Sequence, residues 1–210
     1  MDVDTDSSAE RLMQRPGMQR LPTPKAEIFQ CRNFIAAPLR AALIDLIDYK
    51  RRPSTIADDN GDKYFRTSET CDLDAHEPAV EDLEALLTDL SGIDPAFGEP
   101  CQGQRYAVGQ EFKPHTDYFT PGGPDWEKYC KIAGQRTWTF MIYLNEVEAG
   151  GATRFKAVGK TFQPEPGKLV CWNNRRADGR ENPNTLHHGM IVRMGVKYVI
   201  TKWYRERAWG

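Results

Sequence analysis

Short β-strands separated by turns occupy the sequence from Glu99 onward, and this pattern limits the fold more than any other feature. The longest β-branched and aromatic run is Thr137–Leu144, which reads T-W-T-F-M-I-Y-L. Shorter runs of the same kind are Thr161–Phe162, Leu169–Trp172, Met190–Val192 and Tyr198–Tyr204. Turn residues separate the runs at Gly150–Gly151, Pro166–Gly167 and Gly195. Since two helical segments come before these strands, the order predicts an α+β fold with a β-barrel or jelly-roll core.

Two segments before Glu99 have apolar residues at helical spacing. The first starts at Pro38, which suits the first turn of a helix, and carries Leu39, Leu43, Ile44 and Ile47. The second follows Pro78, ends at Ser91–Gly92, and carries the stripe Val80, Leu83, Leu86, Leu87 and Leu90. We interpret both stripes as helix faces packed on the sheet. Between them, Asn60–Gly61 is a predicted tight turn.

The N-terminal residues 1–24 are polar, contain Pro16, Pro22 and Pro24, and have no sustained period, which predicts a flexible leader. Residues 25–210 are enough to bury one hydrophobic core without disulfide bonds, so we expect a single domain there. The five cysteines are odd in number and have no C-x-x-C spacing. This pattern argues against a zinc cluster or a disulfide framework and favours reduced packing residues.

The charges nearly cancel, with 28 Lys and Arg residues against 30 Asp and Glu residues. Composition therefore gives no reason to expect nucleic acid or an anionic membrane as a partner. The sequence has no apolar run of about 18 residues, and its acidic, serine-bearing start differs from a secretory signal. A cytoplasmic location is the default prediction, and the oligomeric state is left open.

A histidine and a carboxylate lie two residues apart at the end of the stretch Tyr106–Asp117. In an extended segment residues i and i+2 point to the same face, so His115 and Asp117 can meet at one point. Together they make two thirds of a mononuclear non-haem iron site. The other histidines are His76, His187 and His188. The last two lie beside a β-rich run, and His187 is 72 residues beyond His115, a separation that suits two strands closing a barrel.

Six ordered motifs cover most of the chain from Phe65 to Arg207. The first three are F-R-T-S at 65–68, E-x-x-Q-x-x-R-Y at 99–106 and G-Q-E-F-K-P-H-T-D at 109–117. The others are Y-L-N-E-V-E-A-G-G-A-T-R-F at 143–155, P-G-K-L-V-C-W at 166–172 and H-H-G-M-I-V-R-M-G-V-K-Y-V-I-T-K-W at 187–203. With these motifs the chain resembles the prolyl 4-hydroxylase group of Fe(II)/2-oxoglutarate-dependent dioxygenases. The resemblance implies a double-stranded β-helix, a jelly-roll barrel with helices packed outside.

The resemblance also implies a ligand set, with Fe(II) bound by His115, Asp117 and His187. It selects His187 over His188 because the distal histidine of this group precedes the 2-oxoglutarate-binding lysine by ten positions, as His187 precedes Lys197. His188 and His76 remain the alternatives. In enzymes of this group 2-oxoglutarate and O2 are co-substrates, and ascorbate is a candidate reductant.

Lys197 is the residue that the resemblance assigns to the far carboxylate of 2-oxoglutarate, and we count it with the catalytic residues. It stands in an otherwise apolar strand, where a buried lysine without an anion would be costly. A lysine that points outward into solvent is the alternative. Tyr106 and Thr153 match the hydroxyl donors to 2-oxoglutarate, whereas Trp172 is expected to be a packing residue.

Substrate contacts are also implied by the resemblance. The residues that match the peptide groove of the group are Arg66, Ser68, Glu99, Arg136 and Trp203. A structural set of ion pairs is the alternative for the two arginines and Glu99. Phe112 stands where tyrosine is common, and Arg205 stands where peptide hydroxylases often carry histidine, so both departures affect substrate contacts and leave the oxygenase chemistry intact. The loop 120–135, with Trp126 and Tyr129, is a candidate lid, and an ordinary surface loop is the alternative.

The predicted reaction hydroxylates an unactivated C–H bond while 2-oxoglutarate is decarboxylated to succinate and CO2. Asp117 favours hydroxylation because related halogenases carry a small residue at this place. The predicted substrate is a prolyl residue in a peptide or protein, and the alternative is a free amino acid or other small molecule. A non-catalytic metal-binding jelly-roll module and a zinc hydrolase are alternatives of another class, but zinc has no use for a lysine awaiting a dicarboxylate.

Overall fold

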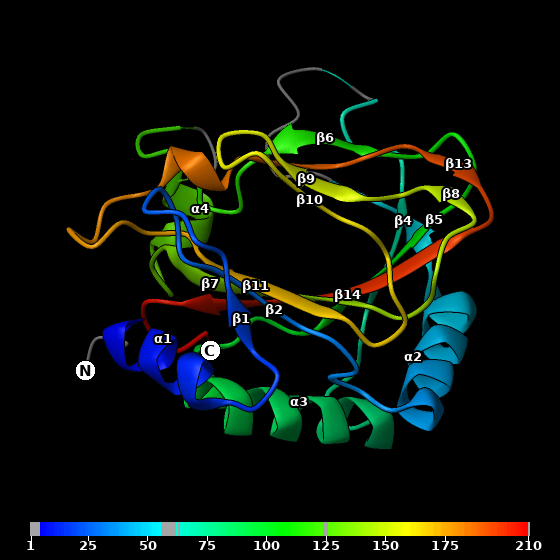
Figure 1. Cartoon of the computed structure of the whole chain (residues 1–210), viewed down its shortest axis with the longest axis horizontal. Coiled ribbons are helices and arrows are strands. Elements are labelled where there is room, and N and C mark those ends of the chain that lie inside the picture. Colours follow the sequence, from blue (N-terminus) through cyan, green and yellow to red (C-terminus); the bar gives the residue numbers. More distant parts are fainter. Residues whose placement is uncertain (1–4, 56–61, 63, 124–125, 210) are drawn as a thin grey trace.

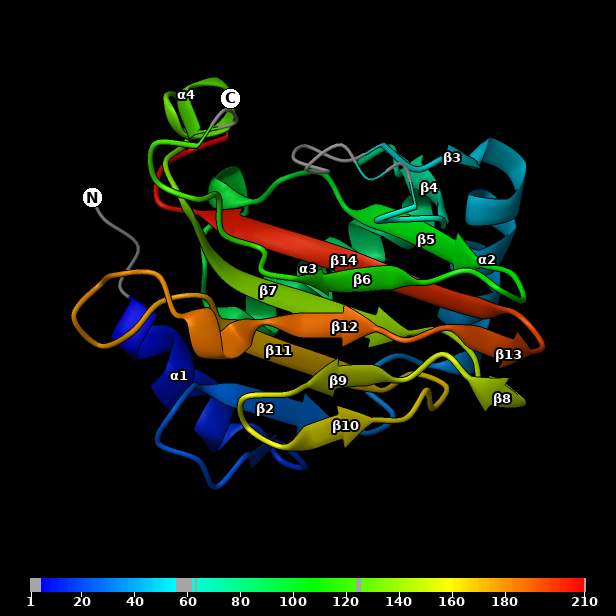
Figure 2. The same ribbon diagram turned by 90° about the horizontal axis from the view of Figure 1, so that it is seen from above.

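Two antiparallel sheets form the body of the protein, seen from above in Figure 2. The computed structural model describes residues 5–55, 62, 64–123 and 126–209. The main sheet has the strand order β1–β2–β11–β7–β14–β5–β4–β3. Its strands are β1 (Gln19–Arg20), β2 (Ile28–Cys31), β3 (Arg52–Pro53), β4 (Glu69–Asp72), β5 (Gln102–Tyr106), β7 (Arg136–Tyr143), β11 (Leu169–Asn173) and β14 (Lys197–Arg205). The last strand in the sequence, β14, is therefore a central strand of the sheet.

A smaller sheet with the order β10–β9–β12–β6 lies over the main sheet. Its strands are β6 (Phe112–His115), β9 (Thr153–Phe155), β10 (Lys160–Phe162) and β12 (His187–Gly189). The short strands β8 (Ala149–Gly150) and β13 (Val192–Met194) pair with each other at one end. The helices are α1 (Thr5–Gln14), α2 (Ala37–Lys50), α3 (Pro78–Ser91), α4 (Trp126–Cys130) and the 3₁₀ turns η1 (Pro95–Phe97) and η2 (Pro183–Thr185).

Helices α2 and α3 lie outside the barrel, on the face of the main sheet that points away from the small sheet (Figure 1). The predicted stripes form this contact, with Leu43 and Ile47 of α2 and Leu83 and Leu87 of α3 fully buried. Helix α3 ends as predicted, since Gly92 adopts a left-handed conformation with φ of 69° and its N–H bonds to Thr88 O. These contacts leave the inner face of the sheet to the barrel interior.

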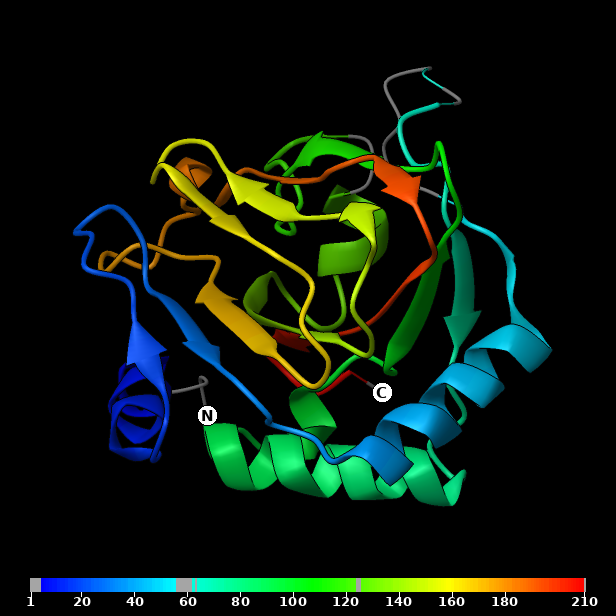
Figure 3. The ribbon, with the colours of Figure 1, turned by 45° about the vertical axis from the view of Figure 1, so that its right-hand side comes forward.

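The long strands separate an outer from an inner set of side chains, because successive residues of a strand point to opposite faces. On β7, Trp138 and Phe140 pack under the helices, whereas Met141 and Tyr143 belong to the cluster between the two sheets. That inner cluster fills the barrel. Figure 3 shows the ribbon of the barrel from another side. Its larger members are Tyr106, Tyr143, Phe155, Phe162 and Trp172. The arrangement confirms the predicted α+β class with a jelly-roll core.

Several predictions differ from the structure. Residues 5–14 lie in the expected flexible leader but form α1, because Leu12 is fully buried against α3 and Arg11 and Arg15 both bond to Asp89. The predicted strand Met190–Val192 is divided, since β12 ends before it and β13 begins within it. The predicted turn at Asn60–Gly61 lies outside the described residues.

The five cysteines are all buried and free, as predicted. Among the residues that the structure describes, no helix has the length and hydropathy needed to cross a bilayer.

Candidate active site

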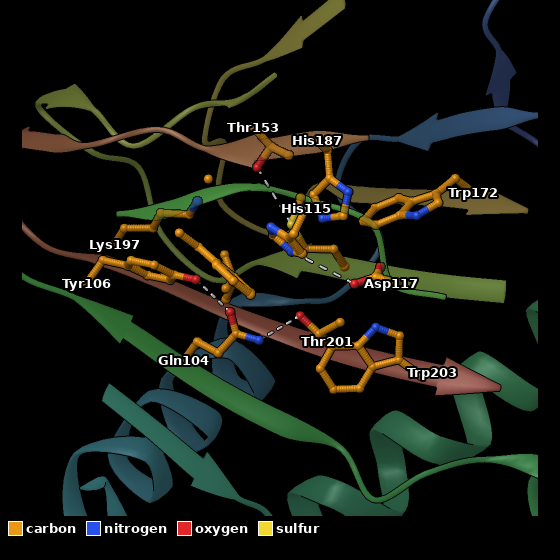
Figure 4. A pocket seen from close by; sticks show the side chains of 14 residues that line it. Gln104, Tyr106, His115, Asp117, Thr153, Trp172, His187, Lys197, Thr201 and Trp203 are labelled. Atoms are coloured by element: carbon orange, nitrogen blue, oxygen red, sulfur yellow. Dashed lines mark hydrogen bonds and ion pairs between the residues drawn. The ribbon is translucent and has the colours of Figure 1, made fainter. Parts of the chain in front are cut away.

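Strands β6 and β12 bring two histidines face to face. His187, the first residue of β12, pairs directly with His115, the last residue of β6. Asp117 follows two residues after His115 and points back to it, with Oδ1 3.9 Å from His115 Nε2. One potential ligand atom from each of the three side chains lies within 4.8 Å of the others. The structure therefore joins the three residues that the sequence proposed as metal ligands (Figure 4).

Both imidazoles are held in the tautomer that a metal ligand needs. His115 Nδ1 lies 2.7 Å from Lys113 O, and His187 Nδ1 lies 3.0 Å from Thr185 O. A carbonyl oxygen only accepts, so each Nδ1 carries the proton and each Nε2 keeps a free lone pair. Burial lowers the pKa of both rings, that of His115 well below its usual value. The neutral rings are suited to bind a divalent cation.

Asp117 contributes the anionic member of the cluster. Its side chain is almost fully buried, and Oδ2 accepts a hydrogen bond of 2.7 Å from Thr139 Oγ1 on β7. Two neutral imidazoles and one carboxylate on one side of a cavity are the donor set of a facial-triad iron site, which leaves other coordination positions open. These side chains therefore fit Fe(II).

The alternative histidines lie elsewhere. His188 follows His187 in the strand and so faces the other side, where its Nε2 is 2.8 Å from Glu111 Oε2. His76 is exposed in the turn before α3. Neither histidine belongs to the cluster of three ligands.

A small cavity between the two sheets, called the chamber below, is lined by His115, Asp117 and His187. Lys197 of β14 also lines this chamber (Figure 4). The side chain is 2% exposed, so it does not point into solvent. Its Nζ lies 4.9 Å from the centre of the Tyr106 ring and 5.4 Å from that of Tyr143. No ion pair of this ammonium is found in the described part of the chain, and burial lowers its pKa from 10.5 to about 7. A buried cation without an anion is the feature expected of a site for an acidic ligand.

Two residues with hydroxyl groups, Tyr106 and Thr153, line the chamber together with this lysine. Thr153, predicted as a donor, lines the chamber and accepts a 2.7 Å hydrogen bond from the Tyr143 hydroxyl. Tyr106, the other predicted donor, bonds to Gln104 Oε1 at 2.9 Å. The sequence analysis missed Tyr143, although strand alternation places it on the same face as Met141 and thus inside the barrel. It also missed Gln104, whose amide donates to Thr201 in the chamber wall.

A groove of about 900 Å³ adjoins the chamber. Phe112, His115, Asp117 and Trp203 line both spaces, so the three-ligand cluster lies where they meet. Other aromatic residues of the groove wall are Phe65, Tyr118, Phe119, Trp126, Tyr129 and Trp209. The shared wall gives a long molecule in the groove access to the metal ligands.

Glu99 is at the centre of a buried ion-pair set in the groove wall. It accepts two hydrogen bonds from Arg136, at 2.6 and 2.7 Å, and one from Arg205 at 2.9 Å. Burial alone raises the pKa of Glu99, but the two arginines outweigh it and hold the pKa below its usual value. The predicted structural alternative thus describes these contacts, and both oxygens of Glu99 already have partners.

Arg66 lines the groove, and its hydrogen-bond partners among the described residues are neutral. It donates to Ser68, Thr70 and Gln102, and its guanidinium lies 4.9 Å from the centre of the Phe112 ring. Phe112 in turn stacks on His115 with ring centres 3.5 Å apart. Ser68, a predicted substrate residue, is 2% exposed and lies outside the groove wall, behind Arg66.

The C-terminal residues tie down the end of the predicted lid. Arg205 donates to Tyr129 O, Arg207 donates to Cys130 O, and Glu206 N–H bonds to Gln135 O. Residues 124–125 of this loop lie outside the described residues. The part from residue 126 onward contains α4 and forms one side of the groove.

The fold and the site together define a class, a jelly-roll protein with a candidate facial-triad metal centre and an adjacent cationic pocket. Residues 101–205 match the family model of the 2OG-Fe(II) oxygenase superfamily, and the chain belongs to this family. Its members are dioxygenases that use Fe(II) and 2-oxoglutarate, as the sequence predicted.

Two groups of relatives are similar to the chain in sequence. It is 32% identical to human prolyl 4-hydroxylase subunit alpha-1 over 197 residues. This matched region covers 91% of this chain and 37% of the relative. The chain is 34% identical over 145 residues to human prolyl 4-hydroxylase subunit alpha-3, which covers 68% and 26%. The chain therefore spans less than two fifths of the length of these relatives.

Solved structures support the fold. The viral collagen prolyl hydroxylase of Paramecium Bursaria Chlorella virus-1, in its 2OG complex, matches with a TM-score of 0.64 and 22% identity over 85% of this chain and 95% of that chain. A prolyl-4-hydroxylase of Pseudomonas putida matches with a TM-score of 0.61 and 19% identity over 96% and 98%. These likenesses confirm the double-stranded β-helix.

Proposed function

We propose that this chain hydroxylates a prolyl residue in a peptide or protein, with Fe(II) held by His115, Asp117 and His187. The observation that carries the proposal is Lys197, a buried cation without an acidic partner in the described chain, in the chamber that the three ligands share. A dicarboxylate that reaches from the metal to this ammonium would remove the cost of burying it. 2-Oxoglutarate, the co-substrate of the family, has this chemistry.

The side chains have distinct tasks in this proposal. Bound Fe(II) and 2-oxoglutarate together supply the oxidation of a C–H bond by O2, with succinate and CO2 as products. Lys197 pairs with the far carboxylate of 2-oxoglutarate, while Tyr106 and Thr153 contribute hydroxyl groups near it. Phe112 and Trp203 line both the chamber and the groove. They shield the metal ligands on the groove side, and the substrate reaches the metal between them.

The groove supports a peptide as the substrate. Its volume of about 900 Å³ far exceeds that of a free amino acid, and its aromatic wall suits proline-rich segments, which dock into aromatic-lined grooves. Arg66, whose hydrogen-bond partners among the described residues are neutral, is our candidate for binding the peptide backbone beside the reacting proline. Arg136, whose guanidinium lies over the Trp203 ring, is our candidate for a second contact to the peptide. Glu99 acts through Arg136, and Ser68 acts through Arg66. The similar relatives are themselves named prolyl hydroxylases.

Two further parts of the proposal concern conditions in the cell. Ascorbate is proposed as the reductant that returns the iron to Fe(II) after unproductive turnovers. The cytoplasmic location stays a prediction from the sequence.

The test of the function compares two variants with the unaltered protein. Each is incubated with Fe(II), 2-oxoglutarate, ascorbate and either proline-containing peptides or free proline, and succinate and a mass gain of one oxygen atom are measured. Asp117→Ala removes the anionic ligand, so we expect hydroxylation to fall to background. His188→Ala removes a neighbouring imidazole that faces Glu111, so we expect activity within about threefold of the unaltered protein.

Three results would contradict the proposal. If the unaltered protein formed no succinate with any substrate, the chemistry would be wrong. If it modified free proline but no peptide, the substrate class would be wrong. If His188→Ala were inactive and Asp117→Ala active, the ligand assignment would be wrong.

A further inference from the structure

Asp117 is bound on its second oxygen by a buried chain of two polar side chains. Asn174 Nδ2 donates to Thr139 Oγ1 at 2.9 Å, and Thr139 Oγ1 donates to Asp117 Oδ2 at 2.7 Å. We propose that this carboxylate relay, formed by Asn174, Thr139 and Asp117, fixes Asp117 as a metal ligand through Oδ1 alone. The inference rests on the proposed function, because it concerns the same metal centre.

The relay is a built part of the barrel interior. Thr139 lies on the inner face of β7, Asn174 directly follows β11, and both side chains are completely buried. The backbone of Asn174 is held on both sides, since its N–H bonds to Thr137 O and its carbonyl accepts from Asn182 N–H. The amide is therefore presented to Thr139 by the main sheet itself.

The direction of the hydrogen bonds follows from the chemistry of the groups. An amide NH₂ can only donate, so the Thr139 oxygen accepts from Asn174 and its single proton is free for another partner. An ionised carboxylate can only accept, so this proton goes to Asp117 Oδ2. A hydrogen bond to a charged oxygen is about twice as strong as one between neutral groups. The relay thus occupies one of the two oxygens of Asp117.

The unpaired amide oxygen of Asn174 indicates that Asp117 determines the direction of the two hydrogen bonds. Asn174 Oδ1 is buried and has no hydrogen-bond partner among the described residues. A rotated amide would give Oδ1 the Thr139 proton, but Asp117 Oδ2 would then lose its donor. Leaving a buried amide oxygen unpaired is costly, and a hydrogen bond to a charged oxygen offsets that cost. The orientation in the structure is the one that serves Asp117.

The relay matters because coordination positions are few. Three protein ligands would leave three positions of an octahedral metal open for the co-substrates. If the carboxylate turned and bound through both oxygens, it would take one of these positions. By engaging Oδ2, Thr139 would act as a positioning residue that keeps the open positions of the metal free for the co-substrates.

Anaerobic titration with Co(II), followed by its visible d–d absorption, tests the relay without substrate or turnover. Thr139→Val keeps the shape of the side chain and removes the hydroxyl, so we expect cobalt affinity to fall about 10- to 100-fold and the band shape to change. Thr139→Ser restores the hydroxyl and should stay within about threefold. Asn174→Asp replaces the donor by a second acceptor and should also weaken cobalt binding about tenfold or more.

Thr137→Val is the matched control for folding. Thr137 lies two residues away on the same strand and is equally buried, but its hydroxyl donates to Tyr204 O rather than to a ligand. We expect its cobalt affinity to stay within about twofold. Unchanged affinity and band shape in Thr139→Val, or an equal loss in Thr137→Val, would overturn the relay. A protein that binds cobalt in this pattern but hydroxylates nothing would support the relay and refute the proposed function.

Discussion

Lys197 is the residue whose ionisation connects the site to pH. Burial holds its pKa at about 7 in the folded chain, against an ordinary value of 10.5. Above pH 7 the Lys197 side chain is therefore mainly neutral when no ligand is bound. A bound dicarboxylate, in contrast, requires the ammonium form of this side chain. Because a ligand that prefers the protonated state raises the pKa, binding of 2-oxoglutarate above pH 7 has to take up a proton.

We predict that the affinity for 2-oxoglutarate is greatest below pH 7 and falls up to about tenfold per pH unit above it. Isothermal titration calorimetry at pH 8.5, in buffers with different ionisation enthalpies, should find uptake of close to one proton on binding. Lys197→Arg keeps a permanent charge and should remove the proton uptake. An unaltered protein that binds 2-oxoglutarate at pH 8.5 without taking up a proton would contradict the prediction.

The residues of the site differ in how well the sequence predicts them. His115 and Asp117 are two residues apart, so their spacing in the sequence was enough to predict that they lie together. Thr139, Tyr143 and Asn174 are ordinary strand or loop residues in the sequence, and no spacing rule links them to the histidines. They become site residues only once the pairing of β7 with β11 and β14 determines which of them face the barrel interior.

At the level of elements, β5 and α2 lie in close contact at Gly103. A β-carbon added to Gly103 would lie 2.4 Å from Ile47 Cγ1, closer than real atoms approach. The absence of a side chain therefore lets α2 rest on the sheet next to β4 and β5. The approach is a packing requirement of the scaffold and lies on the outer face, away from the metal ligands.

We predict that Gly103→Ala lowers the free energy of unfolding by about 1–3 kcal/mol, as expected for overpacking. Urea denaturation measures the loss. Ile47→Ala removes the clashing atoms and creates a cavity, and the double variant should be less destabilised than the sum of the two single variants. Strict additivity of the two effects would argue against a direct contact.

The sequence predicts long elements better than short ones. The stripes of α2 and α3 and the apolar runs of β7, β11 and β14 carry enough residues to show their period. Two-residue strands such as β1 and β3 have no period of their own and form because a neighbouring strand offers hydrogen bonds. Helix α1 was missed because its sequence is largely polar and shows no apolar stripe, although Leu12 is fully buried.

For the whole molecule, α1 extends the core rather than the site. Leu12 joins the cluster between the main sheet and the helices, while the ligands lie on the inner face of the barrel. We predict that Leu12→Ala lowers the free energy of unfolding by about 2–5 kcal/mol and leaves cobalt affinity within about twofold. Chemical denaturation and metal titration check the two parts. Met13→Ala, at a side chain that is 55% exposed, is the matched control and should change stability by less than about 0.5 kcal/mol.

The architecture of the whole chain was predictable from the order of its motifs. The two strands that carry His115 and His187 are separated by a long segment, and they have few ways to bring both histidines to one site. The outer part of the groove was not predictable, since its wall there comes from Leu186, the helix α4 and the C-terminal residues Arg205 and Trp209, which share no pattern in the sequence.

The place of β14 has a consequence for synthesis. This strand is last in the sequence, yet it lies between β7 and β5 in the sheet. A ribosome that has not passed residue 205 therefore holds a chain with two open strand edges, the kind of surface that promotes aggregation. The main sheet is therefore complete only once β14 has been inserted between β7 and β5.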